Sequence, residues 1–228
     1  MTLNTCVFDA YGTLFDVNAA ARIAANEPDR KIFKEVWPSV SNIWRMKQLQ
    51  YTWLRSMTDS YIDFWSITQN SLDFALETHK LQNDLVLKER LLALYWELQP
   101  YSEVSQMLKD LKENGIKTAI LSNGSPEMLS GAVRSSDLNK FIDEIISVDT
   151  VKIFKPSARV YEQVENIIGC SKIDVLFVSS NGWDIAGAAG FGFTTAWVNR
   201  LKDPIDRLLH KPRHIVEDLT SIPSFFSN

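Results

Sequence analysis

Residues 6–15 have the sequence Cys-Val-Phe-Asp-Ala-Tyr-Gly-Thr-Leu-Phe, and their character changes abruptly in the middle. The apolar run Cys6–Phe8 leads into Asp9 and a glycine follows soon after, which predicts a short strand that breaks at the carboxylate. A side chain at the carboxyl end of such a strand lies at the rim of an open α/β sheet, where ligands bind. We therefore expect Asp9 to face a ligand and to be able to act as a nucleophile.

From Pro100 onward, apolar stretches of strand length alternate with helical patterns. The expected strands are 117–122, 145–148, 174–180 and 194–198, and the expected helices are 104–111, 159–168 and 185–189. Alternation of this kind predicts a parallel sheet with helices packed on its faces. The predicted fold class is therefore α/β, with a Rossmann-like, doubly wound and mostly parallel sheet as its core.

The stretch 16–99 differs, because it has helical patterning and no strand pattern. Five of the seven tryptophans lie in it, and apolar residues recur at helical spacing, among them Ile43, Leu49, Trp53, Leu54 and Met57. We expect a Rossmann-like catalytic core made of residues 1–15 and 100–228, and a helical cap subdomain made of residues 16–99 with its own packed interior. Short connections at both ends would let the cap act as a lid.

The composition is that of an ordinary globular protein, with 228 residues, 45% hydrophobic and 23% charged. A formal net charge of −4 provides no basic surface, so we expect no nucleic-acid partner. Cys6 and Cys170 lie in or beside apolar stretches, which predicts buried thiols rather than a disulfide and suits a cytoplasmic protein. We find no apolar run long enough to span a bilayer and no leader pattern, so no membrane partner is expected.

A second strand end, Leu121–Glu127, has the sequence Leu-Ser-Asn-Gly-Ser-Pro-Glu. Ser125 is a suitable N-cap with a proline at the first helical position, so the joint presents backbone N–H groups beside the Ser122 hydroxyl. Such a joint can bind an anion, although many capped joints are purely structural. Because it belongs to the same sheet as Asp9, we favour the anion-binding interpretation.

Two more loops carry charged residues toward the same rim. Lys155, before Pro156, is either a surface charge or an ammonium that reaches Asp9 and favours its ionised form. Asp184 follows the polar run Ser179–Trp183 and either caps a helix or belongs to a cluster that holds and deprotonates a water molecule.

As a set, these loops resemble those of the L-2-haloacid dehalogenases within the haloacid dehalogenase superfamily. Phe8–Leu14 contains the superfamily pattern Asp-x-x-Gly-Thr, and Lys155-Pro156 is similar to its third motif. The loops 119–124 and 177–184 and the cap segment 44–55, Trp-Arg-Met-Lys-Gln-Leu-Gln-Tyr-Thr-Trp-Leu-Arg, are also similar to theirs. The resemblance spans about Asn4 to Arg200, and the full set is far more specific than the first motif alone.

The resemblance implies hydrolysis of short-chain (S)-2-haloalkanoic acids to (R)-2-hydroxyalkanoic acids and halide. Asp9 would attack C2 with inversion and form an ester on its own side chain, and water would then cleave that ester. A desolvated carboxylate and a cradle for the departing anion suit this chemistry. The resemblance implies no metal and no organic cofactor, and by analogy with the family we expect a homodimer.

Residue roles follow from the resemblance position by position. The implied catalytic residues are Asp9, Thr13, Arg45, Ser122, Lys155, Tyr161, Ser179, Asn181 and Asp184. The implied substrate-binding residues are Ala10, Tyr11, Arg45, Leu49, Phe64, Ser122, Asn123 and Trp183. Arg45 would hold the halide with Asn123 and Phe64 near it, unless it extends outward to solvent. Ser122 would bind the substrate carboxylate.

The resemblance also implies roles for residues around Asp9, and for Asp184 it leaves two alternatives. Thr13 should hydrogen-bond near Asp9, and Tyr161 should orient Lys155. Asp184 is either the base that activates water, together with Ser179 and Asn181, or a structural partner of Lys155. Met46 stands where the family often has glutamine, so we expect an effect on the polarity of the pocket and on substrate size.

Two other functions remain as alternatives. A Mg²⁺-dependent phosphatase of the same superfamily usually has a second aspartate two residues after the nucleophile, whereas this chain has Tyr11, and few oxygen ligands remain for a hard cation. A binding module without catalysis would use the cleft or the aromatic cap, and the intact Asp9, Lys155 and Asp184 argue against it. The histidines lie outside these loops, which argues against a zinc site or a histidine-assisted triad.

Overall fold

The computed structural model describes residues 3–226, and its core is one sheet of six strands. They are β1 (Thr5–Phe8), β2 (Lys117–Ser122), β3 (Glu144–Ser147), β4 (Val175–Ser179), β5 (Thr194–Val198) and β6 (His214–Val216). Their order is β3-β2-β1-β4-β5-β6, and all neighbouring pairs are parallel. This order defines a doubly wound α/β fold and confirms the predicted fold class.

The central strand β1 lies between β2 and β4, with Val7 level with Ala119 on one side and with Phe177 on the other. From β1 the chain builds the sheet first toward β3 and then, from β4 on, in the opposite direction. A reversal of this kind opens a crevice at the carboxyl ends of the strands, which is where ligands bind in such sheets. Asp9 stands directly at this crevice.

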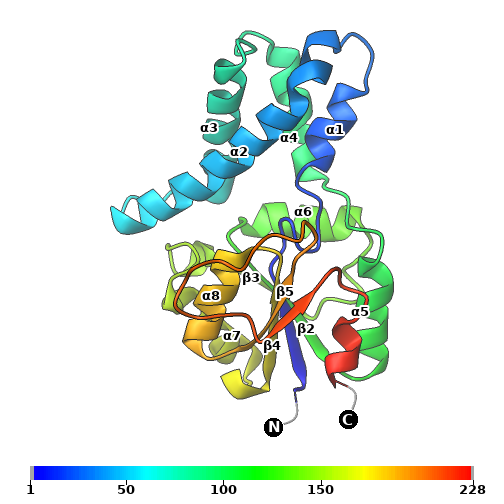
Figure 1. Cartoon of the computed structure of the whole chain (residues 1–228), viewed down its shortest axis with the longest axis vertical. Coiled ribbons are helices and arrows are strands. Elements are labelled where there is room, and N and C mark those ends of the chain that lie inside the picture. Colours follow the sequence, from blue (N-terminus) through cyan, green and yellow to red (C-terminus); the bar gives the residue numbers. More distant parts are fainter. Residues whose placement is uncertain (1–2, 227–228) are drawn as a thin grey trace.

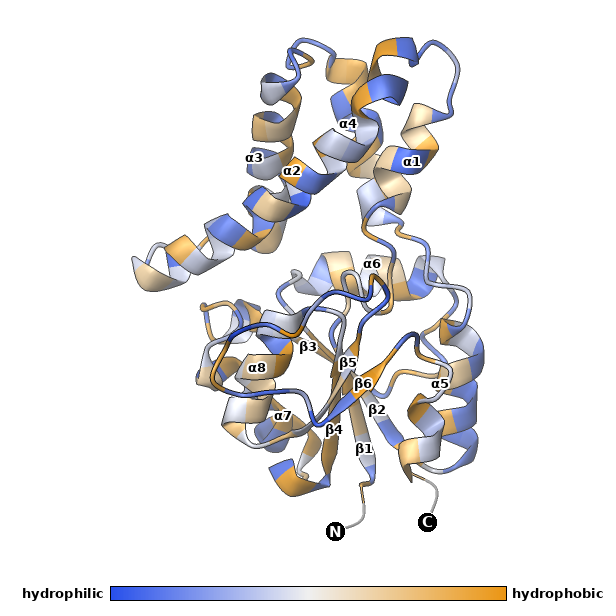
Figure 2. Cartoon of the chain, in the orientation of Figure 1, coloured by the Kyte–Doolittle hydropathy of each residue, from blue (hydrophilic) through white to orange (hydrophobic). Residues whose placement is uncertain are grey.

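Four helices cover the sheet: α5 (Val104–Glu113), α6 (Pro126–Ser135), α7 (Ala158–Ile168) and α8 (Gly182–Phe191). In Figure 1, α5 lies on one side of the sheet, and α7 and α8 lie on the other. Every residue of β1 and β4 is buried, as expected for a parallel sheet covered on both faces. Figure 2 shows the matching distribution, with hydrophobic residues along the strands and mixed faces on the helices.

The segment after β1 forms four helices above the carboxyl ends of the strands (Figure 1). They are α1 (Ala19–Ala25), α2 (Lys31–Met57), α3 (Phe64–Thr78) and α4 (Leu85–Trp96). We call this group of helices the cap; α2 packs against α3, and α1 packs against α4 and α2. The exact division into residues 1–15 with 100–228 and residues 16–99 stays a prediction. None of the helices between residues 3 and 226 could cross a membrane.

The structure corrects two expectations. The tail contributes a sixth strand, β6, that the sequence pattern did not reveal, because three residues are too few to establish a period. The apolar stripe of α2 is also less buried than expected, since Met57 is 81% exposed and Leu54 is 49% exposed. In Figure 1 the end of α2 projects beyond the other cap helices, which leaves its last turn without a cap helix beside it.

Candidate active site

The turn after β1 places Asp9 and Thr13 against each other. The backbone N–H of Asp9 donates to the Val178 carbonyl at 2.9 Å and so continues the ladder to β4. Gly12 has a positive φ of 91°, and an added Cβ there would lie 3.2 Å from the Ser180 hydroxyl. A glycine is therefore required for this turn. The turn brings the Thr13 hydroxyl to 3.0 Å from Asp9 Oδ2.

Both oxygens of Asp9 are held by donors from separate loops. Oδ2 accepts hydrogen bonds from the Thr13 hydroxyl and from Asn181 Nδ2, each at 3.0 Å. Oδ1 accepts from Lys155 Nζ at 3.1 Å. With only 7% of its surface exposed, Asp9 is a carboxylate largely removed from water and fixed in orientation.

Lys155 bridges two buried carboxylates. Its Nζ donates to Asp184 Oδ2 at 2.9 Å as well as to Asp9, and both Lys155 and Asp184 are almost completely buried. Burial acts to lower the pKa of Lys155, but the charges of Asp184 and Asp9 outweigh it, so the pKa is raised above its ordinary value. Lys155 therefore stays protonated at neutral pH.

Asp184 does not cap α8, which corrects the structural alternative considered for it. The N-cap of this helix is Asn181, and Asp184 lies in its first turn with its side chain hydrogen-bonded to Lys155. Tyr161 donates to Asp184 Oδ1 at 2.7 Å, so both carboxylate oxygens have donors. Burial, reinforced by the charge of Asp9, raises the pKa of Asp184 in spite of Lys155. Gly187 permits this packing, since an added Cβ would lie 2.6 Å from the Tyr161 hydroxyl oxygen.

The loop after β4 links the nucleophile to the cap. Ser179 is buried, and its hydroxyl accepts from the backbone N–H of Asn181 at 3.2 Å. The amide of Asn181 donates to Asp9, while its Oδ1 accepts from Arg45 Nη2 at 3.4 Å. Asn181 thus contacts groups on both sides of the cavity.

The loop after β2 provides hydrogen-bond donors. Ser125 caps α6, as the sequence indicated, and the Ser122 hydroxyl accepts from the backbone N–H of Gly124 at 3.2 Å. Asn123 Oδ1 accepts from the backbone N–H of Lys155 at 3.0 Å, which ties two of the four loops together. Within residues 3–226, the backbone N–H groups of Tyr11 and Asn123 have no hydrogen-bond acceptor. They can therefore donate to an anion.

A small cavity lies where these loops meet the cap. It is lined by Asp9, Tyr11, Arg45, Leu49, Phe64, Ser122, Asn123, Asn181 and Trp183. The space accessible to a water molecule is about 10 Å³, room for roughly one water, so the cap is closed over the nucleophile. Arg45 points inward from α2 and donates to the Tyr11 carbonyl at 3.2 Å. Ala10 is buried, and its side chain does not line this cavity.

The cavity has an aromatic wall. Tyr11 stacks against Phe64 and Tyr95, with ring centroids 5.7 and 5.8 Å apart. Burial, together with Tyr95 and Asp9, raises the pKa of the Tyr11 phenol well above its ordinary value. The phenol therefore stays protonated, and it cannot serve as a base at neutral pH. Trp53, one of the apolar residues at helical spacing in α2, is 36% exposed but packs edge-to-face on Trp183 at 5.5 Å.

Several residues near the site were not identified from the sequence. They include Tyr95, which stacks on Tyr11, and Ser180, whose hydroxyl oxygen lies 3.2 Å from that of Thr13. Ser56, on α2, accepts from the backbone N–H of Phe154, next to Lys155, at 3.1 Å. No local pattern marks such contacts, because their partners are far away in the chain. Met46 is 55% exposed and does not line the cavity, so it does not contact the pocket directly.

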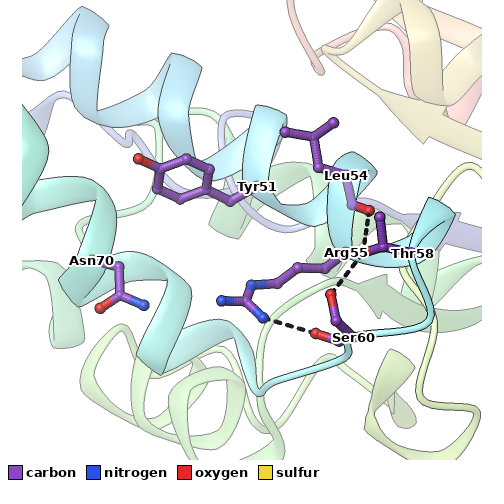
Figure 3. A pocket seen from close by; sticks show the side chains of 6 residues that line it. All are labelled: Tyr51, Leu54, Arg55, Thr58, Ser60 and Asn70. Atoms are coloured by element: carbon purple, nitrogen blue, oxygen red, sulfur yellow. Dashed lines mark hydrogen bonds between the residues drawn. The ribbon is translucent and has the colours of Figure 1, made fainter.

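A larger hollow of about 440 Å³ lies between the end of α2 and the middle of α3 (Figure 3). It is lined by Tyr51, Leu54, Arg55, Thr58, Ser60 and Asn70. Its one cation, Arg55, already donates to the Ser60 carbonyl at 2.8 Å. No carboxylate, lysine or histidine that could activate its hydroxyl groups lines the hollow, so we assign the active site to the smaller cavity around Asp9.

Comparison with known proteins agrees with this geometry. Residues 3–192 match the family model described as haloacid dehalogenase-like hydrolase. (S)-2-haloacid dehalogenase 1 from Pseudomonas sp. (strain CBS-3) is 43% identical over 221 residues, which are 97% of this chain and 95% of that protein. A solved dehalogenase with an intermediate complex has a TM-score of 0.94 and 39% identity, covering 100% of this chain and 99% of its own.

The L-2-haloacid dehalogenase from Xanthobacter autotrophicus, solved with chloropropionic acid covalently bound, has a TM-score of 0.86 and 35% identity, with 97% of each chain covered. The chain thus belongs to the haloacid dehalogenase-like hydrolases. Within that family it falls among the (S)-2-haloacid dehalogenases, as the sequence motifs indicated.

Removing the cation between the two carboxylates should destabilise the fold in a pH-dependent way. We expect Lys155→Met to lose about 3–5 kcal/mol of unfolding free energy at pH 8, because two buried carboxylates would face each other unpaired. Protonation of Asp184 at lower pH removes one of those charges, so the deficit should shrink as the pH falls toward 4. Urea unfolding of both proteins across this range measures it.

Lys140→Met is the matched control, since Lys140 pairs with Asp137 at 2.9 Å on the surface and should contribute about 0–1 kcal/mol. A Lys155→Met deficit that is equally small, or that grows on acidification, would contradict the role assigned to the buried ammonium.

Proposed function

We propose that the protein hydrolyses the carbon–halogen bond of short-chain (S)-2-haloalkanoic acids, giving (R)-2-hydroxyalkanoic acids and halide. The observation that carries this proposal is the state of Asp9: a nearly dry carboxylate, held by three donors, facing a closed cavity that contains an arginine. The relatives named above support it with their own activity.

In the first step, an oxygen of Asp9 attacks C2 of the substrate from the side opposite the halogen. The new C–O bond forms as the C–halogen bond breaks, and the halide leaves with the bonding electrons. Attack from behind inverts C2 and leaves an ester on Asp9. Because Thr13, Asn181 and Lys155 fix the carboxylate before the substrate arrives, little reorganisation is needed in the transition state.

Binding requires places for two anionic groups. The substrate carboxylate is bound by the Ser122 hydroxyl and by the free N–H groups of Tyr11 and Asn123. The developing halide is stabilised by the Arg45 guanidinium, which the cap holds across the cavity from Asp9. Leu49, Phe64 and Trp183 contact the alkyl group. Since the closed cavity holds only about one water molecule, the cap opens to admit the substrate.

In the second step, water attacks the carbonyl carbon of the Asp9 ester. The bond between the Asp9 carbonyl carbon and the alkyl oxygen breaks. One proton of the water goes to the departing alkoxide, and the other is released to solvent as the Asp9 carboxylate is regenerated. Ser179 and Asn181 orient this water. Asp184, with its raised pKa, accepts the proton of the water, or else it acts only by holding Lys155.

The proposed reaction uses no metal ion. The positive charge that neutralises Asp9 comes from Lys155, whose ammonium contacts both carboxylates at about the distance of a hydrogen bond. A Mg²⁺-dependent phosphatase would instead need an acid–base group at position 11, and the buried Tyr11 phenol keeps its proton. No observation favours this alternative.

Halide release tests the proposal directly. With (S)-2-chloropropionate we expect chloride and an (R)-2-hydroxy acid, with little release from the (R) substrate and no loss in the presence of a chelator. Asp9→Asn should lower the rate on the order of 10³-fold or more, because it removes the nucleophile. Asp203→Asn, an exposed carboxylate, should leave the rate unchanged. Activity that needs Mg²⁺, or binding without turnover, would contradict the proposal.

The role of Asp184 can be separated from that of Lys155. If Asp184 is the base, Asp184→Asn should release about one halide per enzyme and then stall, since only the second step needs the base. Intact-protein mass spectrometry should then show the alkanoate still attached to Asp9. Equal slowing of both steps, with no attached alkanoate, would mean that Asp184 only holds Lys155.

We also propose that the protein is a cytoplasmic homodimer. Large apolar side chains are exposed on the two packed cap helices α2 and α3, namely Met46, Leu54 and Phe74. A second copy of the chain would remove this surface from water. Sedimentation velocity should find a dimer that Leu54→Glu weakens, while Lys140→Glu, on the core, does not. A monomer at all micromolar concentrations would rule the dimer out.

A further inference from the structure

The two connections between core and cap are hydrogen-bonded to each other. Asp16 N–H donates to the Gln99 carbonyl at 2.9 Å, and Tyr101 N–H donates to the Leu14 carbonyl at 3.0 Å. Phe15 and Pro100 form an antiparallel bridge between these bonds. The cap is therefore attached through a short two-stranded ribbon rather than through two independent linkers.

Arg200, just after β5, contacts both strands of this ribbon at its base. Its Nη2 donates to the Thr13 carbonyl at 3.3 Å on the first connection. On the second connection, its guanidinium lies 3.8 Å from the centre of the Tyr101 ring, and its Nη1 is 2.6 Å from a Glu103 carboxylate oxygen. The Arg200 side chain is only 19% exposed, so these contacts are largely shielded from water.

Arg200 is connected to the nucleophile Asp9 through a single residue, Thr13. Thr13 accepts from Arg200 through its carbonyl, and its hydroxyl donates to Asp9 and accepts from the backbone N–H of Ser180 at 2.8 Å. One residue thus joins the cap ribbon, the turn after β1 and the loop after β4.

We propose that Arg200 is a positioning residue for the dehalogenation: it locks the base of the cap ribbon to the turn that aligns Asp9. The cap then moves without displacing the base of the ribbon, and Thr13 keeps its hydrogen bond to Asp9 whether the cap is open or closed. This inference rests on the proposed function for its kinetic consequence, but the lock itself is a property of the structure.

An arginine suits this position and a lysine does not. The guanidinium is planar, so it can lie on the Tyr101 ring while its two Nη groups reach the Thr13 carbonyl and Glu103 in different directions. A lysine ammonium is a compact charge and can neutralise Glu103, but it cannot make the other two contacts together. Comparing arginine with lysine at position 200 therefore distinguishes alignment of Asp9 through Thr13 from simple neutralisation of the Glu103 charge.

The experiment compares Arg200→Gln and Arg200→Lys with wild type, and uses the same substitutions at Arg207 as controls, because Arg207 lies on an exposed loop. Rapid-quench mass spectrometry measures ester formation on Asp9 from (S)-2-chloropropionate in a single turnover. Hydrogen exchange without substrate follows peptides covering residues 12–17 and 98–103. Urea unfolding reports whether each variant is folded.

We expect both Arg200 variants to slow ester formation by roughly tenfold to a hundredfold. The substrate concentration that gives half of the maximal rate should change by less than about threefold, because the alignment of Asp9 is lost and substrate binding is not. Exchange should rise in both peptides, and the Arg207 variants should match wild type. If Arg200→Gln does not fold, Arg200→Lys decides alone.

The inference is overturned if a folded Arg200→Lys forms the ester within about twofold of wild type, or if exchange rises in neither peptide. A different result identifies failure of the proposed function: wild-type protein that forms no ester from any 2-haloacid. In that case hydrogen exchange alone decides whether Arg200 locks the ribbon.

Discussion

The ammonium of Lys155 between Asp9 and Asp184 is the contact on which the rest of the active site depends. Two buried carboxylates this close repel each other, and one buried cation makes the arrangement stable. The triad still has an excess negative charge, which hydrogen bonds from Thr13 and Tyr161 help to disperse. Those bonds also fix each carboxylate in place, so the same contacts that permit burial prepare the nucleophile.

The sheet topology brings these groups together. Asp9 follows β1, Lys155 follows β3 and Asn181 follows β4, so the partners of Asp9 lie 146 and 172 residues away from it in the chain. Parallel strands end at one edge, and the reversal of strand order beside β1 leaves that edge open. The crevice can therefore be filled from several loops without disturbing the buried strands.

The cap completes a site that the core cannot form alone. Arg45 and Phe64 come from cap helices, and they face Asp9 across a cavity with room for about one water molecule. The cap also contacts the loop before Lys155 through Ser56. Exclusion of water strengthens every charge interaction inside, which favours attack by a carboxylate and departure of an anion.

The sequence alone was enough to predict the α/β class, five of the six strands, the helical insertion and the loops that carry Asp9, Lys155 and Asp184, because periodicity, turns and caps are local properties. It could not predict β6, the exposure of Met57 or the solvent-facing position of Met46, since burial depends on what another segment covers. The pairing of Arg200 with Thr13 and Glu103 was also decided only by tertiary structure. A contact between distant segments leaves no period in the chain, and it exists only once the sheet has brought its partners together.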